Sequence, residues 1–195
     1  MRTATLKRKT TETDIDIELN LDGNGKYSID TGCGFLSHML ELFASHSRFD
    51  LSLKCKGDVE VDYHHSVEDI GISLGEVLSK AWGDKRGIKR FATTILPMDE
   101  ALALVSLDIS GRGSLDYDVS FSGEKVGELD VELIEEFMTG LSRSAGITLH
   151  IKQLAGKNSH HIVEAIFKAL ARALREATSI DTRLDGEIPS TKGVL

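Results

Sequence analysis

The sequence predicts an α+β fold built from two related halves, with sheets covered by helices. Segments of alternating apolar and polar residues and segments of helical spacing both occur, and one stretch occurs twice. The first copy runs from His64 to Ala81, and the second runs from His160 to Ala177, 96 residues later. Eight of the 18 aligned positions are identical, against roughly one expected by chance at ordinary residue frequencies. This similarity predicts an internal duplication.

The first half, residues 1–93, opens with two alternating segments that fit half-buried strands, 3–9 and 13–21. The tight turn Asp22-Gly23-Asn24-Gly25 predicts a hairpin whose return strand is 26–30. After a glycine-rich break, the patterns predict a helix over 35–46, a strand over 49–55 and a helix over about 64–82.

The second half, residues 94–180, repeats this order. Alternation over 102–108 and 115–121, around Gly111-Arg112-Gly113, predicts another hairpin. A helix over 128–144, a strand over 147–151 and a helix from His160 to about 177 follow. Each half therefore reads as hairpin, helix, strand, helix, within one compact unit. The tail follows as residues 181–195, and its segment 185–193 is polar and non-helical.

Composition excludes several classes of protein. The chain has 195 residues, 41% apolar and 28% charged, an ordinary globular balance. The formal net charge of −8 argues against a nucleic-acid partner. The sequence contains no run of 18 apolar residues, which argues against a membrane span. The N-terminus lacks the apolar core of a secretory signal. Cys33 and Cys55 have no metal-binding spacing and fit a reducing cytoplasm.

The repeated stretch opens each time with H-H-x-V-E-x-I, a pattern suited to metal binding. The glutamate lies three and four residues after the two histidines, on the same helix face. Adjacent histidines point about 100° apart, so one helix start could serve two ions. Imidazole and carboxylate suit Mn, Fe or Zn. One copy alone is equally well explained as an exposed His pair at a helix start, whereas two matched copies favour a metal.

Four blocks together make the chain resemble the imidazoleglycerol-phosphate dehydratase family of histidine biosynthesis. They are GFLSHMLELFASH at 34–46, DYHHSVEDIGISLG at 62–75, NSHHIVEAIFKALARALR at 158–175 and IPSTKG at 188–193. The resemblance covers nearly the whole length. It implies a duplicated β/α unit like the second domain of ribosomal protein S5. The chain departs from the family at Ser37, where Asp is usual, and at Glu136, where some members have His.

The resemblance implies dehydration of D-erythro-imidazole glycerol phosphate to imidazole acetol phosphate and water through a metal-bound imidazolate. It implies two Mn²⁺ per subunit, or other divalent transition metals. The implied metal ligands are His38, His64, His65, Glu68, Glu136, His160, His161 and Glu164. The implied catalytic residues are Glu12 as general base, His38, His65, Glu68, His161 and Glu164. The implied substrate-binding residues are Glu12, His38, His46, Arg90, Arg112, Ser190 and Lys192, and the tail 181–195 would bind the phosphate.

The resemblance also implies a homo-oligomer of about 24 subunits built from trimers, with sites at subunit interfaces. His150 is interpreted as a structural residue within a strand and is left out of the ligand set. Two other functions stay open on the residues alone. A two-metal hydrolase, such as a phosphatase, would also use paired ions. A non-enzymatic metal-binding protein is the third reading, although carboxylate-bridged storage sites use a different order of Glu and His on helix bundles.

Overall fold

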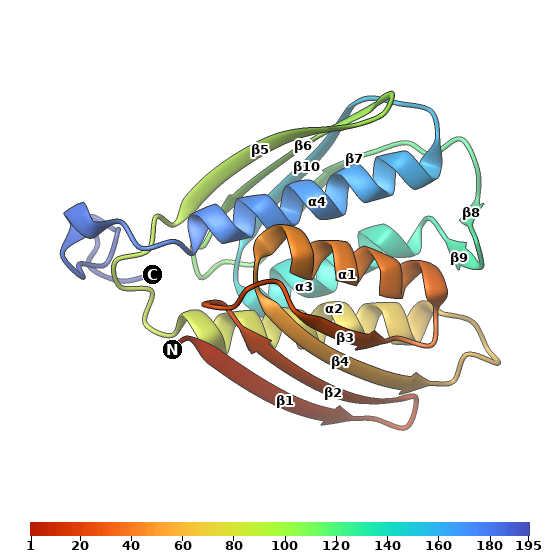
Figure 1. Ribbon diagram of the computed structural model, residues 1–195, viewed down its shortest axis with the longest axis horizontal. Helices are drawn as coiled ribbons and strands as arrows, with labels where there is room; N and C mark the ends of the chain where they lie inside the picture. Colours follow the sequence, from red (N-terminus) through yellow and green to blue (C-terminus); the bar gives the residue numbers. More distant parts are fainter.

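Two four-stranded sheets enclose a layer of four helices in the computed structural model, which describes residues 1–195 (Figure 1). The first half contributes β1 (Thr3–Lys9), β2 (Thr13–Asn20), β3 (Tyr27–Asp30), α1 (Gly34–Ser47), β4 (Asp50–Gly57) and α2 (His64–Trp82). The second half contributes β5 (Phe91–Met98), β6 (Ala101–Asp108), β7 (Ser114–Asp118), α3 (Leu133–Ala145), β10 (Thr148–Ala155) and α4 (Ser159–Ala177). Two short strands, β8 (Lys125–Val126) and β9 (Leu129–Asp130), form a separate small hairpin.

The two halves have the same topology, which confirms the predicted α+β duplication. The first sheet has the order β1-β2-β4-β3, and the second has the order β5-β6-β10-β7. Strand β2 shows the predicted alternation, with Ile15, Ile17 and Leu19 buried and the residues between them exposed. Helix α2 lies on the first sheet and α4 on the second, while α2 packs against α3 and α1 packs against α4. The helices therefore join the two halves into one core.

The predicted return strands of the two hairpins are wrong in their pairing. Strand β3 is not the neighbour of β2, because β4 lies between them and pairs with β3 in parallel. Strand β7 likewise pairs with β10 in parallel. The loop after β2 crosses the start of β4, where the Asp50 carboxylate accepts the N–H groups of Asn24 and Lys26 at 2.8 and 2.9 Å. A Cβ on Gly23 would lie 2.5 Å from Asp50, so the loop can cross β4 this closely because residue 23 is glycine.

Other boundaries also differ from the sequence prediction. Strand β5 was not predicted, and it runs across the proposed division between residues 93 and 94, which itself stays a prediction. The helix predicted over 128–144 begins only at Leu133, because the hairpin of β8 and β9 occupies the preceding residues. The tail contains one 3-10 turn, Thr182–Leu184, in which the Asp181 side chain accepts the N–H of Arg183. None of the helices combines the length and the hydropathy that a bilayer crossing requires.

Candidate functional site

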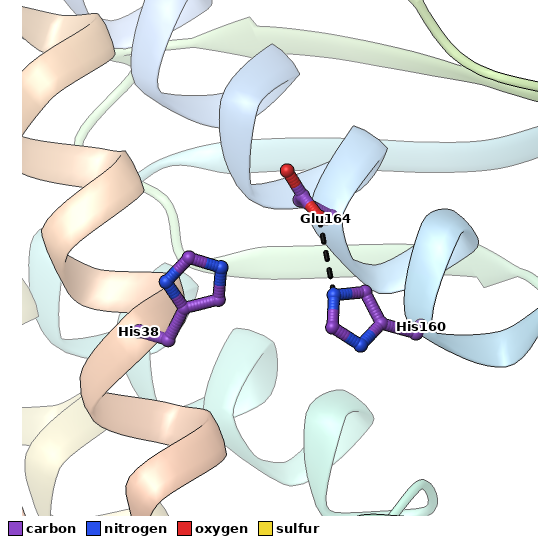
Figure 2. A group of neighbouring side chains, drawn as sticks. All are labelled: His38, His160 and Glu164. Atoms are coloured by element: carbon purple, nitrogen blue, oxygen red, sulfur yellow. Dashed lines mark ion pairs between the residues drawn. The ribbon is translucent and has the colours of Figure 1, made fainter.

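One group of side chains has the composition and spacing of a metal site. His38 comes from α1, and His160 and Glu164 come from α4 (Figure 2). Their potential ligand atoms all lie within 4.8 Å of one another. Glu164 is buried, whereas His38 is exposed and His160 is partly buried. Two imidazoles and one carboxylate are ligands that Mn, Fe and Zn accept.

The start of α4 positions the second histidine pair. Asn158 caps the helix, and its side-chain oxygen accepts the N–H of His160 at 2.9 Å and that of His161 at 3.4 Å. His160 and Glu164 are four residues apart and so share a helix face, with Nε2 and Oε2 3.2 Å apart. The Phe35 ring packs edge-on against His160, with ring centroids 5.2 Å apart. The cap and this packing fix the imidazole beside the carboxylate.

Glu164 is kept ionised although it is buried. Burial pushes the pKa of this carboxyl upward, but Lys168 Nζ lies 2.5 Å from Oε1 and, with the two neighbouring imidazoles, brings the pKa below its ordinary value. The carboxylate form is the one that binds a metal ion. Lys168 therefore favours the form of Glu164 that can bind a metal ion.

The first histidine pair lies at the start of α2 among other carboxylates. His65 Nδ1 is 3.0 Å from Asp58 Oδ2, and His65 Nε2 is 3.7 Å from Glu12 Oε1. The hydrogen bond with Asp58 raises the pKa of His65, and the charge of Glu12 adds to this effect. The ring of His64 lies next to that of His65, with centroids 6.1 Å apart. Glu12 thus reaches the histidine pair from the turn between β1 and β2.

His161 has a related environment in the second half. Its Nδ1 is 2.7 Å from Glu100 Oε2, and its Nε2 is 3.5 Å from Asp99 Oδ2, both on the turn between β5 and β6. This hydrogen bond raises the pKa of His161 and, together with backbone N–H donors, lowers the pKa of Glu100 to about 2. In both halves, the second histidine of the pair therefore holds a carboxylate through Nδ1.

The structure brings three of the eight predicted ligands into one group and places the others outside it. The five outside are His64, His65, Glu68, Glu136 and His161. Glu136 lies in the first turn of α3 and makes no ion pair. Its predicted role, like that of the other four, stays a prediction.

Four of the seven predicted substrate-binding residues belong to the tail or lie beside it: Arg90, Arg112, Ser190 and Lys192. Figure 1 shows the tail beyond the C-terminal end of α4, away from the start of that helix. Arg90 pairs with Asp108 through Nε and Nη2, at 2.6 and 3.1 Å, and its Nη1 donates to the Pro189 carbonyl at 2.8 Å. Pro189 directly precedes Ser190. The chain end, Leu195, lies against Gly111 beside Arg112. His46 lies apart from this set, on α1, where burial and the charges of Lys168 and Arg172 lower its pKa.

Comparisons with known proteins all point to the same family. A family model for imidazoleglycerol-phosphate dehydratase matches residues 31–174. Proteins of that name from Methylorubrum extorquens and Caldanaerobacter subterraneus are 54% and 58% identical over 195 residues, covering 100% of both chains. The crystal structure of the enzyme from Staphylococcus aureus has a TM-score of 0.84 and 42% identity, covering 92% of this chain and 99% of that one. The one from Pyrococcus furiosus has a TM-score of 0.85 and 43% identity, covering 97% and 100%.

The chain belongs to the imidazoleglycerol-phosphate dehydratase family. Membership makes it an enzyme, a carbon–oxygen hydro-lyase of histidine biosynthesis. The family is metal-dependent, and the group of His38, His160 and Glu164 has side chains that could hold an ion.

The sequence prediction missed several charged residues that contact the histidines or Glu164 in this member of the dehydratase family. Lys168 lies four residues after Glu164, so helical spacing alone could have indicated the contact. Asp58, Asp99 and Glu100 had no such signal. Asp58 lies seven residues before His65 in the irregular loop between β4 and α2, and Asp99 and Glu100 lie on a turn that is far from His161 in sequence. His150 lies on β10 with Nδ1 3.7 Å from Asp116, outside the metal group.

Proposed function

We propose that this family member dehydrates D-erythro-imidazole glycerol phosphate to imidazole acetol phosphate using two divalent ions per chain, preferably Mn²⁺. The observation that carries the proposal is the group of His38, His160 and Glu164, with its carboxylate ionised by Lys168. The remaining predicted ligands, His64, His65, Glu68, Glu136 and His161, would complete the coordination of both ions. When bound, the ions stabilise the anionic form of the substrate's imidazole ring, the only electron sink near the reacting carbons.

The residues around the histidines have distinct roles in this proposal. Glu12 accepts the proton lost from the substrate carbon, as a general base. Asp58 and Glu100 hold His65 and His161 through Nδ1 and so orient Nε2 of each ring. Orientation by a carboxylate in this way is common among metal-binding histidines.

The phosphate of the substrate would bind to Arg90, Arg112, Ser190 and Lys192. These residues lie near the C-terminal end of α4, whereas His160 and Glu164 lie at its start. At 1.5 Å per residue, about 20 Å of helix separates Glu164 from the tail. One small substrate cannot span both, which supports a site completed by a second chain. We propose a cytoplasmic assembly of about 24 subunits, built from trimers, with sites at the interfaces.

A product assay combined with metal analysis tests this function. Metal-loaded protein should bind two divalent ions per chain and form a keto product without releasing phosphate. Glu164→Gln should lower the metal content and reduce turnover at least about 100-fold, because a ligand charge is lost. The matched control is Glu176→Gln on the same helix, where the carboxylate only pairs with Lys89 at the surface. Free phosphate as the product would instead support the two-metal hydrolase, and full activity without bound ions would refute the metal scheme.

A further inference from the structure

A cluster of polar side chains connects the first sheet to α2, next to the turn that carries Glu12. Asp69, on α2, has a side chain only 9% exposed. Thr13 Oγ1 donates to Asp69 Oδ2 at 2.5 Å, and Arg8 Nη1 lies 2.5 Å from the same oxygen. Arg8 is on β1 and Thr13 is on β2, so the single carboxylate of Asp69 joins both strands of the hairpin to the helix.

Thr10 holds the backbone around Glu12 and links it to this cluster, because its hydroxyl also lies 3.2 Å from Thr13 Oγ1. Thr10 Oγ1 accepts the N–H of Glu12 at 3.1 Å and the N–H of Thr13 at 2.9 Å. The carbonyl of Glu12 accepts the N–H of Asp58 at 3.1 Å. Because Asp58 holds His65 through its carboxylate, the turn, the end of β4 and the start of α2 form one connected unit.

The second half has apolar residues at all three corresponding positions. In the first hairpin Lys9 pairs with Asp14, and in the second Pro97 pairs with Leu102, so the same number of residues lies between the two members of each pair. This register matches Arg8 with Leu96 and Thr13 with Ala101, and the repeat matches Asp69 with Ala165. Leu96, Ala101 and Ala165 are all buried in the core. The fold can therefore hold this hairpin on its helix without any charge.

Stability does not explain the charged cluster. A buried ion pair often contributes no more stability than apolar residues of similar volume. Arg8 Nη1 has no aligned hydrogen-bond partner, so this pair is also incompletely satisfied. Unlike apolar packing, the hydrogen bond from Thr13 Oγ1 to the Asp69 carboxylate fixes both direction and distance. The difference between the halves therefore concerns position.

The two turns also differ in how their carboxylates contact histidine. Glu100 is bound directly to His161 at 2.7 Å, whereas Glu12 is 3.7 Å from His65 Nε2, beyond hydrogen-bond distance. Glu12 is thus not held by its histidine. A general base must keep a free oxygen for the substrate's proton, so its position has to be set through the backbone.

We propose that Arg8, Thr13 and Asp69 are positioning residues that place Glu12 for proton transfer. This inference rests on the proposed role of Glu12 as the base. The second half lacks the cluster because its turn supplies carboxylates that bind His161 directly.

The test replaces the three polar residues by the apolar residues found at the matched positions of the second half. The triple variant is Arg8→Leu, Thr13→Ala, Asp69→Ala, in the metal-loaded full chain. Its kcat should fall about 10- to 100-fold, since small misplacements of a catalytic group have effects of this size. KM, metal content and the unfolding midpoint should stay near those of the unmodified chain. Adding Glu12→Gln should lower kcat by a much smaller factor in the triple variant than in the unmodified chain. Amides of residues 10–13 should exchange hydrogen faster in metal-free protein, while those of 98–101 do not change.

Two further variants keep the inference falsifiable. If the triple variant does not fold, Asp69→Asn replaces it, because this substitution preserves the size of the side chain. It should lower kcat and speed hydrogen exchange in the same way, but by smaller factors. Lys7→Ala, which removes an exposed pair with Asp16 in the same hairpin, should leave kcat unchanged. The inference is overturned if the triple variant keeps its kcat. It is also overturned if the kcat losses of the triple variant and of Glu12→Gln simply multiply, or if the amides of residues 10–13 exchange hydrogen at an unchanged rate. No effect of Glu12→Gln in the unmodified chain would instead refute the proposed base, and hydrogen exchange would then decide whether the cluster positions the turn.

Discussion

His46 illustrates how neighbours decide the chemistry of a single residue in this molecule. It lies near the end of α1, partly buried, and faces Lys168 and Arg172 on α4. Burial and these two cations disfavour the imidazolium form and lower its pKa, while Glu164 opposes them weakly. The folded chain therefore holds His46 neutral at a pH where the unfolded chain protonates it.

The His46→Gln variant should change the pH dependence of stability. Between the lowered folded pKa and the unfolded value of about 6.5, the unfolded state binds more protons, so stability falls as the pH falls. The contribution of neutral His46 is complete above about 6.5 and is lost through the window below it. The unmodified chain should thus lose more unfolding free energy between pH 7 and pH 5 than His46→Gln does. Urea unfolding of metal-free protein at both pH values measures this, and equal losses would contradict it.

Helix α2 approaches α3 closely because glycine occupies the contact. A Cβ on Gly71 would lie 2.5 Å from the Phe137 carbonyl oxygen, and one on Gly75 would lie 2.6 Å from that of Leu141. The repeat matches Gly71 with Phe167 and Gly75 with Ala171 on α4, both buried. The two repeated helices therefore keep the same histidine start but pack against their partner helices differently.

Gly71→Ala should destabilise the protein although alanine favours a helix. The gain in helix propensity is about 1 kcal/mol, but overpacking against a backbone oxygen costs about 1–3 kcal/mol. We expect a net loss, read from the urea midpoint. The matched control is Gly34→Ala at the start of α1, where a Cβ would meet nothing within 4 Å. Equal stability of the two variants would show that α2 and α3 can move apart without cost.

At the scale of the whole molecule, the residues assigned to one reaction lie at two ends of one chain. The group of His38, His160 and Glu164, which we propose binds metal, lies at the start of α4, and Arg90 is joined to the tail at its end. Assembly should therefore depend on metal, because an ion bound only by the assembled form stabilises that form by mass action.

Light scattering with and without chelator tests this dependence. Chelation should convert a large particle to small oligomers, an eightfold change in mass if trimers are released from about 24 subunits. Acid should act in the same direction, because histidine must be neutral to bind a metal. Returning Mn²⁺ at neutral pH should restore the large particle. A monomer that binds two ions and turns over substrate would rule the proposed assembly out.

The sequence by itself determined the class of fold, the duplication and the family. These follow from local patterns, since periodicity fixes which face of a segment is buried and the repeated His-His-x-x-Glu start needs no tertiary information. The contact between His160 and Glu164 was readable for the same reason, because four residues on a helix bring them together.

Only the tertiary structure decided which strands pair and which distant residues meet. Alternation is the same for a strand in a hairpin and for one that crosses to a parallel neighbour, so the sequence prediction placed β3 and β7 wrongly. His38 reaches His160 and Arg8 reaches Asp69 through helix packing and sheet register. Those contacts depend on long-range burial, which is a property of the assembled core and leaves no periodic signal in the chain.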